Sequence, residues 1–183
     1  VALREHLNDY KVTTKENLRV EKIESGKINV VHLSNGEVVK ARSVIVATGA
    51  KWRELGVPGE KENKGSGVAY CPHCDGPFYK DKKVVVVGGG NSGIEAAIDL
   101  SKIAREVKVL EFLKDLKADQ LLVERAQSAE NIQIVTNVAT DRIESKDGKV
   151  SAIVYKNRET SEESSHETDG IFVQIGLEPN SAF

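Results

Sequence analysis

The sequence contains no methionine, even at its first position, so we expect it to be a piece of a longer protein. No apolar run is longer than a strand, so the sequence predicts no membrane-spanning helix. It also lacks a signal-peptide pattern at its start. The formal net charge of −2 provides no general attraction to nucleic acid or to anionic lipid. We therefore expect a protein that binds neither nucleic acid nor a membrane.

Cysteine is scarce too, because the chain has only two, at positions 71 and 74. A secreted domain held together by disulfides would carry more cysteines at wider spacing. The close pair instead favours a reducing, cytoplasmic setting and a reversible disulfide. Of the 183 residues, 39% are hydrophobic and 30% are charged. This composition is typical of a soluble globular protein with room for one domain, or for one domain and part of another.

Between residues 18 and 47 the sequence shows the patterns of β-strands. Apolar and polar residues alternate in three segments, at 18–23, 27–33 and 38–39. The dipeptide Asn35-Gly36 is a strong hairpin signal, so these segments predict an antiparallel meander. The continuous apolar run from Ser43 to Ala47 predicts a strand buried on both faces. Residues 56–67 are rich in glycine and charge, which makes them the best candidate for a domain boundary.

A β-α-β pattern follows the boundary. Parallel strands are expected at 83–87, 106–111 and 132–135, with helices between them at 93–104 and 119–128. A three-stranded meander is expected at 138–143, 149–155 and 164–168, and a last buried strand at 170–175. The predicted fold is therefore α/β: a three-layer, Rossmann-like domain of the FAD/NAD(P)-binding type, with a parallel sheet and a three-stranded antiparallel meander.

The first of these parallel strands leads into a glycine-rich turn. Gly88, Gly90 and Gly93 form the pattern G-x-G-x-x-G between a strand and a helix. In a dinucleotide site the first glycine makes the tight turn, the second admits the pyrophosphate and the third lets the helix pack closely. The phosphates then lie at the helix N-terminus, where free N–H groups favour negative charge. The alternative is a turn with a structural role only.

Glu111 ends the next predicted strand, 21 residues after Gly90. A carboxylate at this place accepts hydrogen bonds from the adenosine ribose and repels a 2′-phosphate. No arginine follows Glu111 directly, so the sequence favours NADH over NADPH. The alternative is that Glu111 is a simple surface carboxylate.

The cysteine pair has the spacing of a redox-active dithiol. Cys71 and Cys74 are separated by two residues, a motif that can close a disulfide and lower the pKa of one thiol. Asp75 follows at once and can move protons when the disulfide is reduced. Two alternatives remain: half of a zinc site, or two structural cysteines without reactivity. No second ligand pair is present, so we expect no bound metal.

These motifs together resemble a known family. The segment CPHCDGPFYKDKKVVVVGGGNSGIEAAIDL is similar to the flavin-dependent disulfide reductases of the low-molecular-weight thioredoxin reductase type. Within that family it resembles in particular the flavoprotein subunits of bacterial alkyl hydroperoxide reductases. Three further segments carry the same resemblance: 47–60, 116–120 and 170–176.

The resemblance implies a role for each motif. Cys74 would be the sulfur next to the flavin, Cys71 the interchange thiol, and Asp75 the proton donor and acceptor. Gly176 and Pro179 would belong to the segment that closes the nucleotide site, and Ala47, Thr48 and Gly49 would lie near FAD. The residues implied for NADH are Lys83, Gly88, Gly89, Gly90, Asn91, Ser92, Gly93, Glu95, Ala97 and Glu111.

The resemblance also implies an activity. Electrons would pass from NADH through FAD to the cysteine pair, then to a thioredoxin-like module and a peroxiredoxin-type peroxidase. The intact protein would be a cytoplasmic homodimer. Residues 1–60 would be a partial strip of the flavin domain, and residues 61–183 the NADH-binding domain. Two alternatives are an isolated NADH-binding module without catalysis and a thioredoxin reductase fragment.

Overall fold

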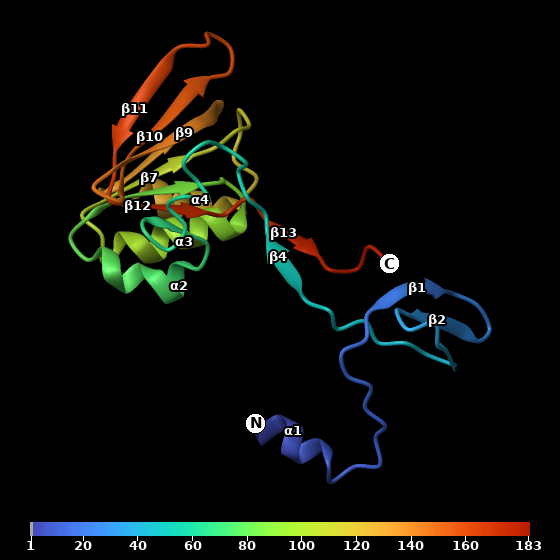
Figure 1. Cartoon of the computed structure of the whole chain (residues 1–183). Helices are drawn as coiled ribbons and strands as arrows, with labels where there is room; N and C mark the ends of the chain where they lie inside the picture. The colour runs from blue at the N-terminus through green and yellow to red at the C-terminus, as the bar shows by residue number, and fades with distance from the viewer. Residues whose placement is uncertain (1) are drawn as a thin grey trace. The chain divides into compact units, whose positions relative to one another are not determined.

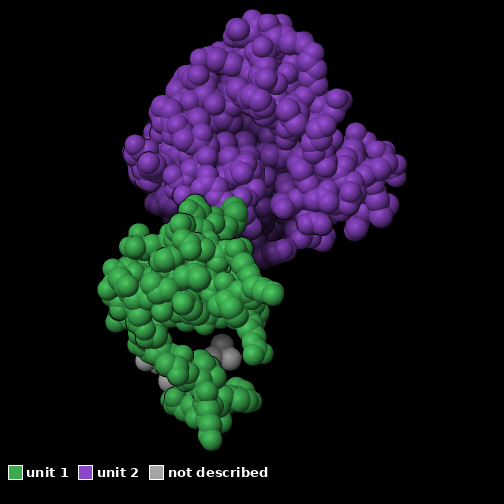
Figure 2. Space-filling view, turned by 90° about the vertical axis from the view of Figure 1, so that its right-hand side faces the viewer, with its two compact units in different colours: residues 1–49, 179–183 green, residues 50–178 purple. Residues whose placement is uncertain are grey.

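The computed structural model describes residues 2–183 and divides the chain into two compact units. Unit 1 consists of residues 1–49 and 179–183, and unit 2 of residues 50–178, shown in green and purple in Figure 2. The sequence pattern had suggested a division at residues 60 and 61. Which unit binds flavin and which binds NADH stays a prediction.

Unit 1 contains a short helix, α1 (Ala2–Leu7), and one small sheet. The sheet is antiparallel in the order β1-β2-β3, with β1 at Val20–Glu24, β2 at Asn29–Leu33 and β3 at Val38–Ala41. Gly36 joins β2 to β3 with φ +83°, a left-handed conformation that glycine adopts without a steric cost. The expected meander is therefore confirmed.

The strand expected from Ser43 to Ala47 is not formed, and this prediction was wrong. Residues 43–49 have no regular secondary structure, and the side chain of Ile45 is 92% exposed. A strand buried on both faces requires neighbouring strands and a covering layer on each side. Within residues 2–183 no strand pairs with this segment. The apolar run alone therefore did not determine its structure.

Unit 2 is built on a five-stranded parallel sheet in the order β5-β12-β6-β7-β8. Its strands are β5 (Val68–Ala69), β6 (Lys83–Val87), β7 (Glu106–Leu110), β8 (Ile132–Val135) and β12 (Gly170–Val173). The helices are α2 (Pro72–Asp75), α3 (Asn91–Ser101) and α4 (Gln120–Gln127), with a 3₁₀ turn η1 at Gly76–Tyr79.

An antiparallel meander completes unit 2. Its strands are β9 (Val138–Lys146), β10 (Lys149–Asn157) and β11 (Glu163–Glu167), in the order β11-β10-β9. Figure 1 shows the meander on one side of the parallel sheet and α3 on the other. A separate two-stranded sheet joins β4 (Ala50–Trp52) to β13 (Leu177–Pro179), where the chain enters and leaves unit 2. The predicted three-layer α/β fold is confirmed.

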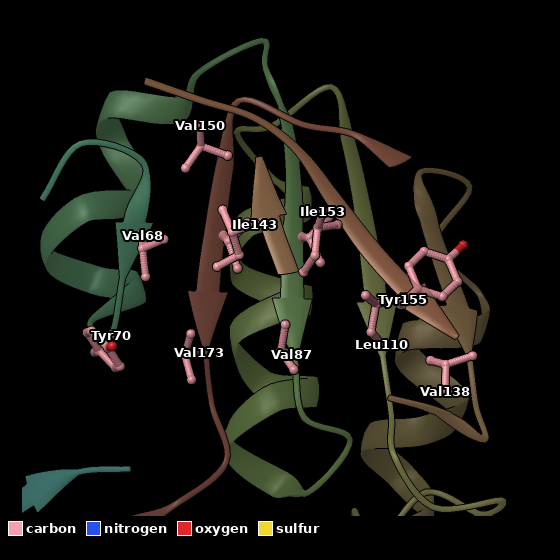
Figure 3. Packing of buried hydrophobic residues seen from close by; sticks show 12 residues of the cluster. Val68, Tyr70, Val87, Leu110, Val138, Ile143, Val150, Ile153, Tyr155 and Val173 are labelled. Carbon is pink, nitrogen blue, oxygen red and sulfur yellow. The ribbon is translucent and has the colours of Figure 1, made fainter. Parts of the chain in front are cut away.

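Successive side chains of β6 point to opposite faces of the sheet and so hold the three layers together. Val84 and Val86 pack in a core shared with α3, whereas Val85 and Val87 pack in a core shared with the meander. All four are buried, because both faces of a parallel sheet are covered. Figure 3 shows the second core, with Ile153 of β10 lying over the sheet.

The carboxyl ends of β6, β7 and β12 meet at one edge of the sheet. The N–H of Gly88, just after β6, donates to the carbonyl of Leu110 at 2.9 Å. The N–H of Gln174, just after β12, donates to the carbonyl of Val87 at 2.8 Å. Ligands of open α/β sheets bind outside this edge, so the fold directs attention to the turn after β6.

Among residues 2–183, no helix has the length and apolar character needed to cross a bilayer.

Candidate functional site

The three glycines of the turn differ in what surrounds them. Gly88 has φ +121°, and a Cβ there would lie 2.3 Å from the carbonyl oxygen of Gln174. A Cβ on Gly93 would lie 1.9 Å from the carbonyl oxygen of Gly88, so α3 packs directly on the turn. A Cβ on Gly90 would meet nothing within 4 Å. The turn is therefore closed at its first and third glycines and open at the second, which is the arrangement that a pyrophosphate requires.

The N-terminus of α3 opens beside Gly90, which is its N-cap and provides no side-chain hydrogen bond. Asn91 was expected to donate to the phosphates. Its amide instead donates to the carboxylate of Asp119 at 3.1 Å, and its side-chain oxygen accepts the N–H of Asp119 at 2.7 Å. Asn91 therefore fixes the start of α4. Ser92 is exposed at the same helix end, where it can contact a ligand.

Glu111 lies just after β7 and is buried, with 8% of its surface exposed. One carboxylate oxygen accepts the backbone N–H of Gly89, and the other accepts the N–H of Leu113 at 2.7 Å. This burial does not fit a simple surface carboxylate. Each carboxylate oxygen has a second lone pair, so Glu111 can support the glycine turn and still accept a ribose hydroxyl.

A cavity of about 790 Å³ opens at this edge of the sheet. The glycine turn and Glu111 contribute polar groups to its lining, and the end of β7 and the start of β9 contribute apolar residues. Its lining residues include Arg53, Leu55, Gly88, Gly90, Glu111, Phe112, Lys117, Val138 and Gly176. A cavity of this size with few polar groups is typical of a small-molecule site, and its donors and carboxylate fit a nicotinamide dinucleotide.

The two cysteines form a disulfide at the start of α2. Cys71 is the N-cap of this helix, and the N–H of Cys74 donates to its sulfur at 3.2 Å. Cys71 is half-buried, whereas Cys74 is exposed. Because the sulfurs are bonded to each other, neither is a thiolate ligand in this state. Residues 2–183 hold no group of three or more His, Cys, Asp or Glu side chains arranged for a metal.

A second cavity, of about 460 Å³, is lined by Cys71 of the disulfide and shares lining residues with the first. Cys71 and Glu95 line it, and Ser92 and Gln174 line both cavities. The side chain of Gln174 donates to the carbonyl of Tyr70, which precedes Cys71, at 2.8 Å. Two residues therefore separate the candidate nucleotide site from the disulfide.

Asp75 is half-buried and does not line the cavity that Cys71 shares with Glu95. It lies in a third hollow of about 440 Å³, together with Cys71 and Phe78. Burial, and after it the charge of Asp75, raises the pKa of the Tyr79 hydroxyl beside it. The carboxyl group is thus close to the dithiol, as a proton carrier must be.

The residues expected at the nucleotide site also included Lys83, Glu95 and Ala97, which do not line the larger cavity. Lys83 begins β6, whereas the turn follows the end of that strand, about 16 Å away at the usual rise per residue. Its N–H donates to Asp169 at 2.9 Å. Ala97 is fully buried between α3 and the sheet. Glu95 is on the exposed side of α3, facing the disulfide cavity rather than the larger one. Residues 83–97 therefore lie in different places: some line the larger cavity, and others lie in the core or beside the disulfide cavity.

The segment implied for FAD belongs to unit 1. The hydroxyl of Thr48 donates to the carbonyl of Asn180 at 2.6 Å, and the N–H of Asn180 donates to the carbonyl of Gly49 at 2.9 Å. Ala47 precedes this contact. The part of the chain that the structure describes has its one glycine-rich turn of the G-x-G-x-x-G type in unit 2. The segment around Thr48 therefore remains the one part of unit 1 for which the resemblance implies contact with FAD.

Several lining residues were missed from the sequence. Arg53 and Leu55 reach the larger cavity from the loop after β4, and the N–H of Arg53 donates to the carbonyl of Gly176 at 3.1 Å. Lys117 lies in the 116–120 segment that the resemblance had marked, but no role followed from it. Gln174 did carry a signal, because it is a polar residue at the end of a buried strand.

Comparison with known proteins decides the family. The family model for pyridine nucleotide-disulphide oxidoreductases matches residues 2–183. The chain belongs to this family. Its combination of a glycine-rich turn and a disulfide in one unit agrees with the family's name, and the resemblance inferred from the motifs is confirmed.

Three relatives illustrate the match. A "NADH dehydrogenase" of Bacillus subtilis is 49% identical over 98% of this chain and 35% of its own length. A subunit of the alkyl hydroperoxide reductase of Pseudomonas aeruginosa is 46% identical over 98% of this chain and 35% of its own length. A thioredoxin reductase structure from Lactococcus lactis has a TM-score of 0.78 and 32% identity over 90% of this chain and 55% of its own. The chain thus spans about a third of the length of these curated relatives.

Proposed function

We propose that this chain is the NADH-binding and dithiol-bearing part of a flavin-dependent disulfide reductase. NADH would supply the hydride, and FAD, held by the whole protein, would supply the two-electron chemistry that links NADH to the disulfide. The family model and the relatives that are subunits of alkyl hydroperoxide reductases support this proposal.

The observation that carries the proposal is the shared wall between two cavities. Ser92 and Gln174 line both the cavity at the glycine turn and the cavity at the disulfide. A dinucleotide laid along the turn and a dithiol therefore belong to one compact unit. A turn with a structural role only would not require an open second glycine or a neighbouring redox pair.

Each residue then has a task. The backbone N–H groups from Gly88 to Ser92 bind the pyrophosphate, and Glu111 accepts the adenosine ribose hydroxyls. Reduction of the disulfide consumes two electrons and two protons and yields the thiols of Cys71 and Cys74. Asp75 carries protons in this step, because it is the acidic group next to the pair. As the resemblance implies, Cys74 would be the sulfur next to the flavin, and Cys71 would attack the disulfide of the acceptor.

The acceptor in this proposal is a thioredoxin-like module that in turn reduces a peroxiredoxin-type peroxidase. Support comes from the relatives, three of which are alkyl hydroperoxide reductase subunits at 45% to 46% identity over 98% of this chain. The small number of cysteines favours the cytoplasm, and we expect the intact protein to be a homodimer.

A second candidate is a module that binds NADH without catalysing any reaction by itself. The observation in its favour is that the segment around Thr48 is the one part of unit 1 for which the resemblance implies contact with FAD. In this case the chain would bind NADH but leave its disulfide unchanged, whether or not FAD is added.

The test is an anaerobic thiol count. The chain is mixed with NADH, with and without added FAD, and the free thiols of Cys71 and Cys74 are measured over time. The proposal predicts NADH binding, and thiols that appear only when flavin is present. NADH binding with no thiols in either sample would favour the second candidate, and no NADH binding would contradict both. The Cys74→Ser variant, which cannot form the disulfide, provides the blank.

Glu111→Ala should weaken NADH binding about tenfold and reduce the preference for NADH over NADPH. The carboxylate accepts hydrogen bonds from the ribose, and such charge-assisted bonds contribute about 1.5–3 kcal/mol. Titration calorimetry with both nucleotides measures the change. Asp115→Ala removes an exposed carboxylate four residues later and should leave both affinities unaltered. Equal affinity of the unmutated chain for NADH and NADPH would refute the cofactor assignment.

A further inference from the structure

An aromatic ring stands at one end of the larger cavity. Phe112 follows Glu111 directly and lines the cavity, yet 53% of its surface is exposed. More than half of this side chain is thus open to contact with a ligand in the cavity. The ring lies next to the carboxylate assigned to the adenosine ribose, which places it where the base attached to that ribose would be.

The ring is held from outside the cavity by Arg158. The guanidinium carbon of Arg158 lies 3.7 Å from the ring centroid of Phe112, a cation–π contact. The same guanidinium donates to the carbonyl of Phe112 at 3.0 Å. Arg158 does not line the cavity, so it supports the ring rather than facing the ligand. The contact with Arg158 therefore favours one orientation of the ring.

The support comes from the meander, a different part of the chain from the turn. Arg158 follows β10, and its N–H donates to the carbonyl of Asn137 just before β9 at 2.9 Å. Beside it, Lys114 forms an ion pair with Glu159. Two contacts therefore tie the loop after β7 to the hairpin between β10 and β11.

Several apolar side chains line the cavity together with Phe112, among them Leu110, Leu113 and Val138. An apolar site with an aromatic ring suits a purine base, because the base is flat, has nearly apolar faces and stacks favourably on aromatic rings. The nicotinamide half, by contrast, has to approach Ser92 and Gln174, which lead to the disulfide.

We propose that Phe112, supported by Arg158, is the stacking platform for the adenine base and determines the affinity of this chain for adenine nucleotides. This inference rests on the proposed function. Arg158 acts through Phe112 and is a positioning residue. The nicotinamide half of the ligand makes no contact with either side chain.

The experiment uses ADP-ribose, which contains adenine but no nicotinamide. Calorimetry should show that Phe112→Ala weakens its binding about tenfold or more, the effect expected when one base loses its stacking partner. Phe112→Tyr, which keeps the ring, should bind within about twofold of the unmutated chain. Arg158→Gln should show an intermediate loss. Phe78→Ala removes another exposed phenylalanine, which lies outside the cavity, and should change nothing.

Nuclear magnetic resonance provides the direct readout. In the ADP-ribose complex, the adenine H2 and H8 protons should show nuclear Overhauser effects to the ring protons of Phe112, and these should vanish in Phe112→Ala. Unchanged affinity of Phe112→Ala, or contacts of adenine to other rings only, would overturn the inference while leaving the proposed function intact. Failure of the unmutated chain to bind either NADH or ADP-ribose would instead overturn the proposed function itself.

Discussion

Gly90→Ala should weaken NADH binding by about 10- to 100-fold and leave the chain folded. Gly93→Ala should impair both the folding of the chain and its binding of NADH. The two positions are three residues apart in one motif, yet their surroundings are opposite. A Cβ on Gly90 would project into open space within the cavity, where the pyrophosphate has to approach the backbone. The cost of that overlap is about 1–3 kcal/mol, which corresponds to the stated range in affinity.

The stability of Gly90→Ala should fall by about 1 kcal/mol at most. Gly90 has φ −82° and ψ −178°, an extended conformation that alanine adopts readily. Only the modest preference of a helix N-cap for glycine over alanine is lost. Gly93→Ala differs, because its Cβ would be 1.9 Å from a backbone oxygen, and backbone cannot yield as a side chain can. We expect a loss of about 3 kcal/mol or more in the free energy of unfolding.

Urea denaturation and NADH titration of the same two proteins separate these effects. A Gly90→Ala protein that binds NADH normally would mean that the pyrophosphate does not lie over the turn. A Gly93→Ala protein as stable as the unmutated chain would mean that α3 can shift away from the turn. Gly148→Ala tests the general cost of a lost turn glycine, because it has φ +75° and lies outside the cavity.

The fold was predictable where a segment with a strand or helix pattern also has neighbouring elements to pack against in the folded chain. The β-α-β stretch from Lys83 to Val135 has short apolar strands and helices of ordinary length, and every strand found its neighbours within unit 2. The run from Ser43 to Ala47 has an equally strong strand pattern but no partner among the described residues. A strand is stabilised by its ladder, which the pattern of a single segment cannot supply.

The shape of the glycine turn was predictable from the sequence, because the demands of that turn are local. The position of Lys83 outside the cavity lining was not, since it depends on which end of β6 faces the cavity. Gln174 and Arg53 were missed for a similar reason. Both line the cavity from segments that are far from the turn in sequence, and a single sequence does not reveal such long-range contacts.

Glu60→Ala should destabilise unit 2 by about 3–6 kcal/mol, although this residue touches neither cavity. Glu60 is fully buried, and its carboxylate accepts three hydrogen bonds. The N–H of Leu55 and the hydroxyl of Tyr70 donate to one oxygen at 2.8 Å and 2.9 Å, and the N–H of Gly56 donates to the other at 2.7 Å. Alanine would leave the buried hydroxyl of Tyr70 and two partly buried N–H groups without this partner, at about 1–3 kcal/mol each, with the N–H groups at the lower end.

Glu60→Ala should also disturb both the candidate nucleotide site and the disulfide segment. Leu55 lines the larger cavity, and Tyr70 immediately precedes Cys71, so the carboxylate of Glu60 fixes one wall of the nucleotide site and the start of the disulfide segment together. Burial, and after it the hydrogen bond to Glu60, raises the pKa of Tyr70 well above its usual value, so its hydroxyl stays a donor throughout the neutral range.

Glu60→Gln distinguishes a specific network from general packing. Glutamine has nearly the same size but only one acceptor oxygen, so its amide group would face at least one N–H or O–H donor. We expect a loss of about 1–3 kcal/mol in the free energy of unfolding, measured by urea denaturation, and weaker NADH binding at a temperature where the variant is still folded. Glu62→Gln, on an exposed neighbour, should alter neither quantity. If Glu60→Gln matched the unmutated protein in both, the buried carboxylate would be a filler of space rather than the link between the two sites.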